Sequence, residues 1–475
     1  MLFSSLSFLF RFFPCLLLCY FVIPKRFREM RNLVLLLFSL AFYGYGGPKY
    51  LLLMLGNIGI NYLGGLLVRD KQGEKRRGVV ALFVALNLGL LGWFKYAGFL
   101  ARNLSNLGLS VPVPQIVLPI GISFFTFQAM SYMLDVYMGD TAVQKNPLKV
   151  ALYVSLFPQL IAGPIVRYTT VENEVDTRNE NLTDFAEGGM RFLFGFAKKI
   201  LLSNALGQIA NAAFDIPSGE LSVVMAWLGA VSYTGQIYFD FSGYSDMAIG
   251  LGRMFGFYFL ENFNYPYIAQ SITDFWRRWH ISLSTWFRDY LYIPLGGNRV
   301  SAKRHVFNML LVWLLTGLWH GAAWNFILWG VYYGLLLVGE NYLWGEAWKK
   351  LPAALRHGVT FVLVVLGWVL FRAVSLADVG AYLSALFAVG GNGLFMDGQA
   401  VYYLRQFRWE LLLAIPACLP VKHWLKAELD KRQESSALAR GVSALAPPIL
   451  ALGSGGLALL YLVGSGFNPF IYFQF

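Results

Sequence analysis

The sequence predicts an all-α protein that crosses a membrane roughly ten to twelve times, at about 20 residues per crossing. Only 13 % of its 475 residues are charged and 57 % are hydrophobic, whereas soluble domains carry about 25 % charged residues. The apolar residues form continuous runs, such as 33–38 and 359–370, whereas a transmembrane β-barrel would alternate apolar and polar residues. The composition also excludes a disordered chain, since such chains are poor in apolar residues.

Lysine and arginine residues gather in clusters between the apolar runs, and such clusters mark the cytoplasmic side of a membrane. This rule predicts that the N-terminus and the C-terminal segment 464–475 are extracytoplasmic. The first apolar run, 3–23, has its basic cluster after it, so we expect a first membrane helix and not a cleaved signal peptide. With no internal repeat, residues 1–475 are predicted to form a single integral membrane domain. The basic clusters lie at 25–31, 69–77, 198–199, 277–304, 349–356 and 422–440.

Residues 260–304 are rich in both aromatic and basic residues and do not fit a simple span. Ser271 and Asp274 form a helix start signal. At helical spacing the large apolar residues gather on one stripe, which predicts a single amphipathic helix lying in the plane of the membrane on its cytoplasmic side. The stripe consists of Phe275, Trp276, Trp279, Leu283, Trp286, Phe287 and Tyr290. His280 lies at its edge, where packing or solvation is the simpler role and catalysis the alternative.

His320 lies between two basic clusters that are both placed on the cytoplasmic side, so the segment around it must be a hairpin. Its first limb, 306–318, covers roughly 20 Å, which is less than an ~30 Å hydrocarbon core. The imidazole should therefore lie inside the membrane, where Gly317 and Gly321 leave space around it. An ionisable residue at this depth is a functional candidate, and imidazole can accept a proton from a hydroxyl. The alternative is a histidine that only holds the turn.

Arginines near His280 form the next candidate group. They could grip the phosphates of a cytoplasmic donor through paired hydrogen bonds, or they could bind anionic lipid headgroups. The four that we single out are Arg277, Arg278, Arg288 and Arg299.

Asp240 and Asp246 lie in an otherwise apolar span, where carboxylates are costly unless they are paired or face a cavity. We expect a partner from Arg253, Arg277 or Arg278, and a structural pair is as plausible as a catalytic role. No metal site is predicted, since neither these residues nor the three cysteines have ligand spacing.

The last residues of the chain are aromatic and include Tyr472. Such residues commonly anchor a chain at the membrane interface. The functional alternative is that Tyr472 accepts an acyl group, because a phenol with a pKa near 10 makes an ester that stays reactive.

Four stretches resemble signature segments of the membrane-bound O-acyltransferases, and the most similar subgroup is the bacterial alginate O-acetylase type. They are IAGPIVRY at 161–168, YFDFSGYSDMAIG at 238–250, WRRWHISLSTWFRDYLYIPLGGNR at 276–299 and GLWHGAAWN around His320. The resemblance extends from the first residues to at least Phe371, whereas 375–406 matches nothing that we can name. The C-terminal segment resembles the end of a small membrane peptide of teichoic-acid D-alanylation, in which a tyrosine is thought to carry the acyl group.

The resemblance implies a funnel of tilted helices around a central tunnel, in a bacterial inner membrane. It matches His320 to the family's invariant histidine and His280 to its second signature histidine. Acetyl-CoA would approach from the cytoplasm, and a serine-hydrolase-like extracytoplasmic partner would complete transfer to a polysaccharide such as alginate, cellulose or peptidoglycan. Membrane lipids are further expected partners and nucleic acid is not. The alternatives are acyl or D-alanyl transfer from a carrier protein, and an exporter without chemistry.

Overall fold

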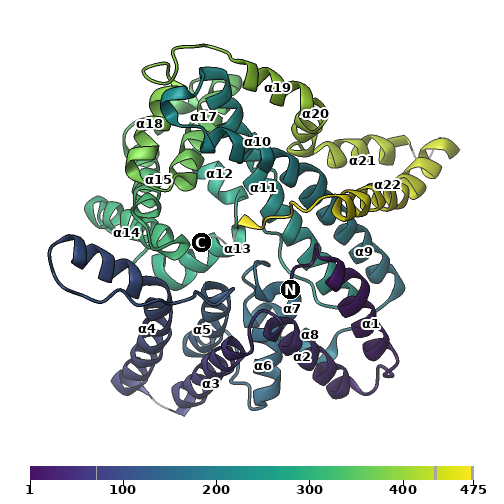
Figure 1. Ribbon diagram of the computed structural model, residues 1–475. Coiled ribbons are helices and arrows are strands. Elements are labelled where there is room, and N and C mark those ends of the chain that lie inside the picture. Colours follow the sequence, from purple (N-terminus) through teal and green to yellow (C-terminus); the bar gives the residue numbers. More distant parts are fainter. Residues whose placement is uncertain (71, 433–435, 472–475) are drawn as a thin grey trace. The chain divides into compact units, whose positions relative to one another are not determined.

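The computed structural model describes residues 1–70, 72–432 and 436–471 (Figure 1). This part of the chain is 76 % helical and contains no strand, which confirms the all-α class. Four of the described helices, α3, α4, α17 and α22, are long and apolar enough to cross a membrane by length and composition. The multi-pass class is thus confirmed, while the number and direction of the crossings stay predictions.

The chain divides into two compact units, each described here by itself. Unit 1 comprises Met1–Phe192 and Met247–Leu260, and unit 2 comprises Leu193–Asp246 and Glu261–Phe475. The single-domain organisation stays a prediction.

The helices of residues 1–197 are η1 (Phe8–Phe12), α1 (Phe13–Phe21), α2 (Arg28–Gly44), α3 (Pro48–Asp70), α4 (Gly73–Asn106), α5 (Ile122–Met138), α6 (Pro147–Ser155), α7 (Phe157–Leu160), α8 (Tyr168–Thr177) and α9 (Leu182–Ala197). Those that follow are η2 (Lys198–Ser203), α10 (Asn204–Asp215), η3 (Ser218–Glu220), α11 (Val223–Met254), η4 (Pro266–Ile268), α12 (Ile272–Arg278), α13 (Ile281–Phe287), η5 (Arg288–Tyr292), α14 (Ala302–His320), α15 (Trp324–Tyr342), α16 (Gly345–Lys349), α17 (Ala353–Arg372), α18 (Leu376–Leu386), α19 (Gly398–Gln406), α20 (Arg408–Ala417), α21 (Val421–Arg432) and α22 (Ala437–Gly464).

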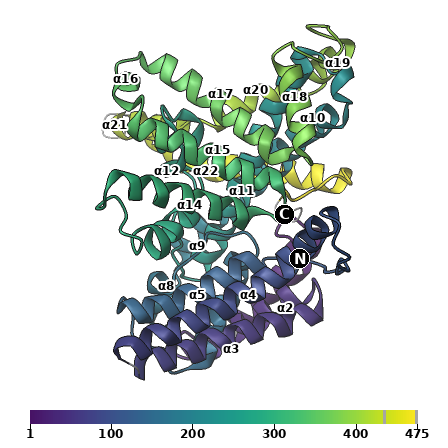
Figure 2. The same cartoon turned by 90° about the vertical axis from the view of Figure 1, so that its left-hand side faces the viewer.

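Within unit 1, helix α3 packs against α2, α4 and α5 (Figure 2). The chain reverses between α2 and α3 at a glycine-rich turn, where Gly47 has a φ of 149° that favours glycine. Proline then opens α3 at Pro48, where its missing N–H costs nothing.

A buried carboxylate ties the segment after α8 to the first two helices of unit 1. The Glu180 side chain is 3 % exposed and forms ion pairs with Arg28 and Arg31. Tyr20 of α1 donates a hydrogen bond to the same carboxylate. Burial acts to raise the pKa of Glu180, but the hydrogen bonds from Arg28 and Tyr20 outweigh it and bring the pKa to about 2. The carboxylate is therefore charged and compensated.

Unit 2 holds an aromatic core between α11, α12, α15 and α17. Helices α14 and α15 form a tight antiparallel hairpin, which confirms the hairpin predicted around His320 (Figure 1). Where the two helices cross, Gly317 and Gly330 have no side chains, so the backbones of α14 and α15 come into direct contact. A Cβ on Gly330 would lie 2.4 Å from the Trp313 carbonyl oxygen, so only glycine fits there.

The prediction of one amphipathic helix through residues 271–290 is wrong. Ser271 does cap its start, because the Ser271 hydroxyl accepts a hydrogen bond from the Asp274 N–H at 3.0 Å. The helix then ends at Arg278, Trp279 is extended, and His280 has a φ of 45° before α13 begins. The spacing of apolar residues shows which of them share a helix face, but it carries no information about a single residue with positive φ. The break at His280 therefore could not be predicted from this pattern.

Candidate active site

His320 is the last residue of α14 and its side chain is buried, with 7 % of the residue exposed. Its ring is surrounded by aromatic rings and lies 5.1 Å from that of Trp329 and 5.2 Å from that of Phe371, both nearly perpendicular to it. The expected space beside it is taken up by packing: a Cβ on Gly321 would lie 2.1 Å from the Phe326 ring. The imidazole therefore lies in an aromatic enclosure and not on an exposed surface.

His280 lies in the break between α12 and α13 and is 2 % exposed, so the expectation of a residue at a helix edge is corrected. Its Nδ1 lies 3.2 Å from Oδ1 of Asn262. The same Oδ1 accepts a hydrogen bond from the backbone N–H of Ser282, also at 3.2 Å. Because a backbone N–H can only donate, that Asn262 atom is the oxygen, and His280 must donate to it from Nδ1.

This bond determines the tautomer of His280. Burial lowers the pKa of His280 to about 3, so the ring is neutral at physiological pH. With the proton on Nδ1, the Nε2 atom keeps its lone pair. Nε2 is buried and has no hydrogen-bond partner among the described residues. His280 thus presents a buried acceptor, held in orientation by Asn262.

One indole links the two histidines. The Trp319 ring lies 5.0 Å from that of His320 and 6.0 Å from that of His280. The structure therefore brings together the two histidines that the sequence singled out 40 residues apart. Whether they are catalytic stays a prediction.

The two carboxylates of α11 are paired with lysines, and not with the arginines that we expected. Asp240 forms an ion pair of 2.6 Å with Lys199, and both side chains are at most 2 % exposed. Asp246 pairs at 2.6 Å with Lys198. These lysines lie in the π-helical segment η2, 41 and 48 residues before their partners. Of the two roles expected for these carboxylates, that of a structural ion pair fits both Asp240 and Asp246.

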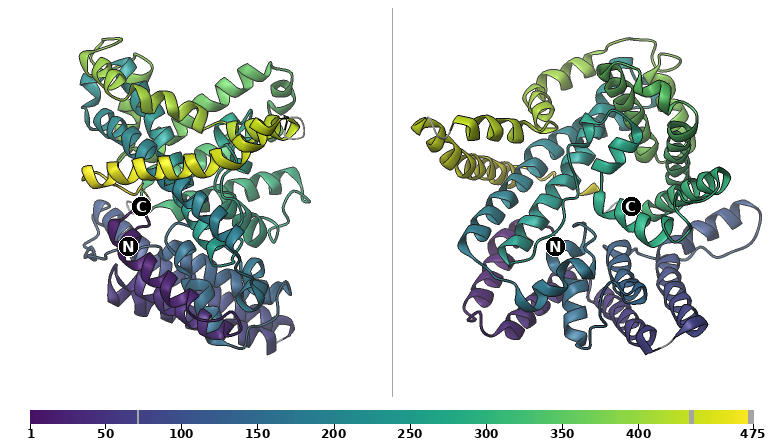
Figure 3. Two further views of the ribbon diagram at one scale, coloured as in Figure 1. Left: turned by 90° about the vertical axis from the view of Figure 1, so that its right-hand side faces the viewer. Right: turned by 180° about the vertical axis from the view of Figure 1, so that it is seen from behind.

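The buried Lys199–Asp240 pair also holds the C-terminal segment. The Lys199 ammonium donates to the carbonyl oxygen of Pro469. The backbone N–H of Ile471 donates to Oδ2 of Asp240 at 2.8 Å. Each partner of the ion pair thereby contacts the backbone of the segment, which runs from α22 past α11 (Figures 1 and 3).

Further contacts bury this segment. Asn204 donates to the carbonyl oxygen of Phe467 at 3.1 Å, and the Phe470 ring lies 4.9 Å from that of Tyr244. Phe470 and Ile471 are 5 % and 3 % exposed, so these two residues are not lipid-facing anchors. Ile471 belongs to the same buried cluster as Trp329 and Phe371. Tyr472 itself lies outside the described residues.

The four predicted donor-binding arginines fall into two pairs. Arg278 and Arg288 form ion pairs with Asp274 and Asp289. Arg277 and Arg299 are exposed, and neither has an ion-pair partner within the described ranges. Their role in binding stays a prediction. No group of three or more His, Cys, Asp or Glu side chains that could hold a metal occurs in the part of the chain that the structure describes.

Sequence reasoning missed several residues that shape the site. Asn262 precedes the break by 18 residues, and a lone asparagine between aromatic residues carries no recognisable spacing. In the sequence Lys199 stands out only as part of a basic cluster, although its position within an apolar helix is a usable signal. The enclosing residues Trp329 and Phe371 looked like ordinary membrane-helix residues.

Comparison with known proteins gives four findings. Residues 141–345, which include both histidines, match the family model of MBOAT, the membrane-bound O-acyltransferase family. The whole chain is 41 % identical to a protein of Azotobacter vinelandii named probable alginate O-acetylase AlgI, with 100 % of both chains covered. A peptidoglycan O-acetyltransferase of Helicobacter pylori is 38 % identical over 83 % of this chain and 81 % of that protein. A teichoic acid D-alanyltransferase of Bacillus subtilis is 29 % identical over 53 % of this chain and 68 % of that protein.

Proposed function

Because the chain belongs to the membrane-bound O-acyltransferase family, and is therefore an acyltransferase, we propose that it moves acetyl groups from cytoplasmic acetyl-CoA across the bacterial inner membrane for O-acetylation of a polysaccharide. Two relatives support this assignment, because their names describe O-acetyl transfer to alginate and to peptidoglycan. Both acceptors are extracytoplasmic polysaccharides with hydroxyl groups. An extracytoplasmic serine-hydrolase-like partner would choose the polymer and complete the transfer.

The observation that carries this proposal is the pair of buried histidines at one indole. His320 is enclosed by aromatic rings, and His280 is held neutral with Nε2 available as an acceptor. Acyl transfer from a thioester to a hydroxyl needs a base for the hydroxyl proton and the exclusion of water, which would hydrolyse the thioester. A buried imidazole inside an aromatic wall supplies both.

In the proposed reaction His320 is the general base. The imidazole takes the proton of the acceptor hydroxyl while the hydroxyl oxygen bonds to the thioester carbonyl carbon. The carbon–sulfur bond then breaks, and the departing thiolate takes the proton back from His320 and leaves as a thiol. His280 accepts a hydrogen bond at Nε2 from an N–H group of the donor and so helps to place the thioester. Thioester and phenyl ester are close in acyl-transfer potential, so the step needs no ATP.

Tyr472 is the acceptor that we propose for this step. Its neighbour Ile471 is buried in the cluster that contains Trp329, which contacts His320. Lys199 and Asp240 hold the backbone just before Tyr472. An acetyl-tyrosine at this position would pass its acetyl group onward to the external partner, since a phenolate is a good leaving group.

Arginine residues support the donor part of the proposal. Arg277 and Arg299 are exposed and would bind the phosphates of acetyl-CoA at the cytoplasmic surface, since guanidinium matches phosphate oxygens. Arg278 and Arg288 already pair with carboxylates, so each would bind the donor by exchanging its carboxylate for a phosphate oxygen. Under this proposal the N-terminus and the C-terminal segment belong to the extracytoplasmic half of the protein.

Reconstituted vesicles test the function. Purified protein is given acetyl-CoA labelled in its acetyl group, and ester-linked label is released with hydroxylamine and counted. We expect label on the wild type and none above background on His320→Ala. His423→Ala is the matched control, because His423 is exposed on α21 and should leave labelling unchanged. Labelling of His320→Ala at the wild-type level would remove His320 from the chemistry.

A second candidate function is D-alanyl transfer from a carrier protein, which the similarity to the teichoic acid D-alanyltransferase favours. The two candidates differ in their donor. If a D-alanyl carrier protein labels the chain and acetyl-CoA does not, the second candidate replaces the first. An exporter without chemistry is not supported by membership in an acyltransferase family.

A further inference from the structure

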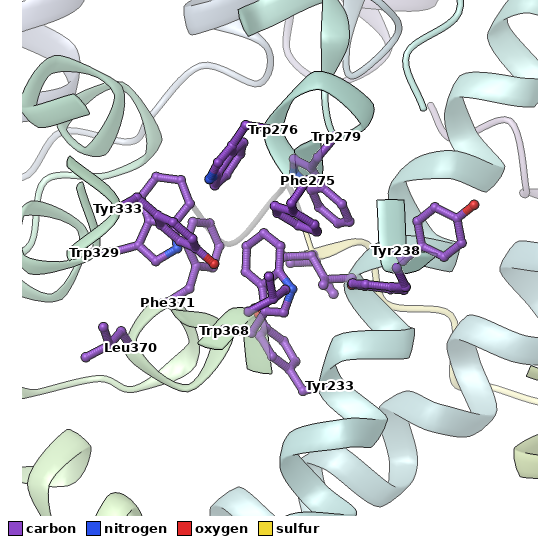
Figure 4. Packing of buried hydrophobic residues seen from close by; sticks show 14 of the residues in the cluster. Tyr233, Tyr238, Phe275, Trp276, Trp279, Trp329, Tyr333, Trp368, Leu370 and Phe371 are labelled. Atoms are coloured by element: carbon purple, nitrogen blue, oxygen red, sulfur yellow. The ribbon is translucent and has the colours of Figure 1, made fainter. Parts of the chain in front are cut away.

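Three side chains with buried hydrogen-bond donors have their rings in mutual contact in the aromatic wall beside His320. The ring of Trp276 on α12 lies 5.5 Å from that of Trp329 and 4.8 Å from that of Tyr333, and the last two rings are 5.2 Å apart (Figure 4). We propose that Trp276, Trp329 and Tyr333 form a carbonyl-binding subsite for the thioester arm of the acyl donor. The proposal rests on the function proposed above and adds the residues that bind and polarise the donor.

Each of the three donors is buried without an acceptor. The residues are 9 %, 1 % and 0 % exposed in the order given. Nε1 of both tryptophans and the hydroxyl of Tyr333 find no hydrogen-bond partner among the residues described. A buried donor without an acceptor loses its hydration and gains nothing in return, so folded proteins seldom keep one. Other buried donors of the described residues also have no acceptor, but the rings of these three are all in mutual contact, and one of them contacts His320.

The chemistry of the donors selects the ligand. An indole N–H can only donate, so the ligand must offer acceptors. The wall around the donors is aromatic, with Trp313, Trp368 and Phe371 in ring contact with Trp276 or Trp329. A neutral carbonyl oxygen fits this wall, whereas an anionic phosphate would need compensating charge. An acyl thioester on a pantetheine arm offers one thioester carbonyl and two amide carbonyls in a row.

The subsite extends away from His320 along α15. Trp329 and Tyr333 are four residues apart on this helix, so they share one face. The ring of Trp329 contacts that of His320 at 5.1 Å, and Tyr333 lies one turn further along. Trp329 would therefore donate to the thioester carbonyl oxygen next to the base, where negative charge develops. Tyr333 and Trp276 would donate to the amide carbonyls of the arm.

The neighbouring Tyr332 provides a matched control. Its hydroxyl donates to the Leu363 carbonyl oxygen at 2.8 Å, so it already has a structural partner. Tyr332→Phe should lower the melting temperature and leave donor binding unchanged. Tyr333→Phe removes an unsatisfied group, so the melting temperature should stay equal or rise while donor binding weakens. If the role of Tyr333 were purely structural, its loss could not weaken donor binding while the melting temperature stays equal or rises.

Binding is measured with acetyl-CoA, as its KM, and with pantetheine, as an inhibitor that has both amides and lacks the nucleotide. Loss of one neutral hydrogen bond should raise both constants by about 3–10-fold in Tyr333→Phe. Pantetheine should also raise the melting temperature of the wild type more than that of Tyr333→Phe, a readout that needs no turnover. Unchanged constants, or a change with acetyl-CoA alone, would overturn the subsite.

Trp329→Phe is the second variant, because it keeps a ring beside His320 and removes the N–H. We expect its kcat to fall by about 10²–10³-fold, as for loss of one donor to a developing oxyanion. A kcat equal to that of the wild type would overturn the role of Trp329. Failure of the proposed function would look different: no donor would label the wild type, while pantetheine would still shift its melting temperature.

Discussion

Lys199 and Asp240 form an ion pair of 2.6 Å inside unit 2, and each of them also binds the backbone of the C-terminal segment. A structural ion pair needs only its two opposite charges. Here the lysine donates to Pro469 and the carboxylate accepts from Ile471, so the direction of the pair also matters. Reversing the two charges separates these roles.

We expect the double variant Lys199→Asp with Asp240→Lys to keep the buried pair and to release the C-terminal segment. An aspartate at 199 cannot donate to Pro469, and a lysine at 240 cannot accept from Ile471. Mass spectrometry should then detect chymotrypsin cleavage after Phe470, which is protected in the wild type by burial. Equal protection in the two proteins, at similar melting temperatures, would show that the pair does not hold the segment.

The α14–α15 hairpin should tolerate no side chain at Gly330. A Cβ there would lie 2.4 Å from the Trp313 carbonyl oxygen, so Gly330→Ala must push the helices apart at a cost of about 1–3 kcal/mol. The control is Gly453→Ala in α22, where nothing lies within 4 Å of the new Cβ. That variant should be neutral or stabilising, by up to about 1 kcal/mol. Thermal unfolding in detergent compares the two, and equal melting temperatures would contradict the close helix contact.

Stability should depend on pH through Glu180. Its pKa is about 2 in the folded protein and 4.5 ordinarily, so the unfolded chain binds the proton more readily. The stabilising contribution is therefore complete above pH 4.5 and is lost as the pH falls from 4.5 towards 2. Glu180→Gln should cost about 3–5 kcal/mol at pH 7, since it leaves buried arginines uncompensated. It should also flatten the loss of stability below pH 4.5, and a variant that is as acid-sensitive as the wild type would contradict this account.

Asn262 should control activity through the tautomer of His280. Asn262→Leu removes the acceptor for Nδ1–H, so the proton can move to Nε2 and abolish this buried acceptor. We expect the KM for acetyl-CoA to rise by about 3–10-fold, as for loss of one hydrogen bond to the donor, and kcat to fall because the thioester is placed less well. Nuclear magnetic resonance of ¹⁵N-labelled histidine would report the tautomer directly. A variant with reduced kcat but an unchanged Nδ1–H tautomer would contradict the mechanism.

The sequence predicted the parts of the fold that depend on local pattern. The hairpin around His320 followed from charge placement and length, and the Ser271 cap followed from a motif. The partner of Asp240 could not be predicted from the sequence, because Lys199 reaches it through tertiary packing and not through spacing along the chain. The break at His280 depends on one positive φ, which apolar periodicity does not record.

The sequence predicted the two histidines of the candidate site but not the aromatic residues that surround them. An imidazole in an apolar run is conspicuous, so both histidines could be named from the sequence. Trp329 and Tyr333 were not, because aromatic residues are common in membrane helices and only burial without an acceptor distinguishes these two. The expectation of open space beside His320 failed because Gly321 makes room for the ring of Phe326.

Tandem mass spectrometry of the C-terminal peptide after incubation with labelled acetyl-CoA tests most directly whether His320 activates Tyr472 as the acetyl acceptor. We expect one labelled acetyl group on the Tyr472 oxygen in the wild type, and none in His320→Ala or Tyr472→Phe. An unlabelled peptide in a wild type that still acetylates polymer would remove Tyr472 from the pathway. Label that persists in His320→Ala would contradict the claim that this imidazole activates the acceptor.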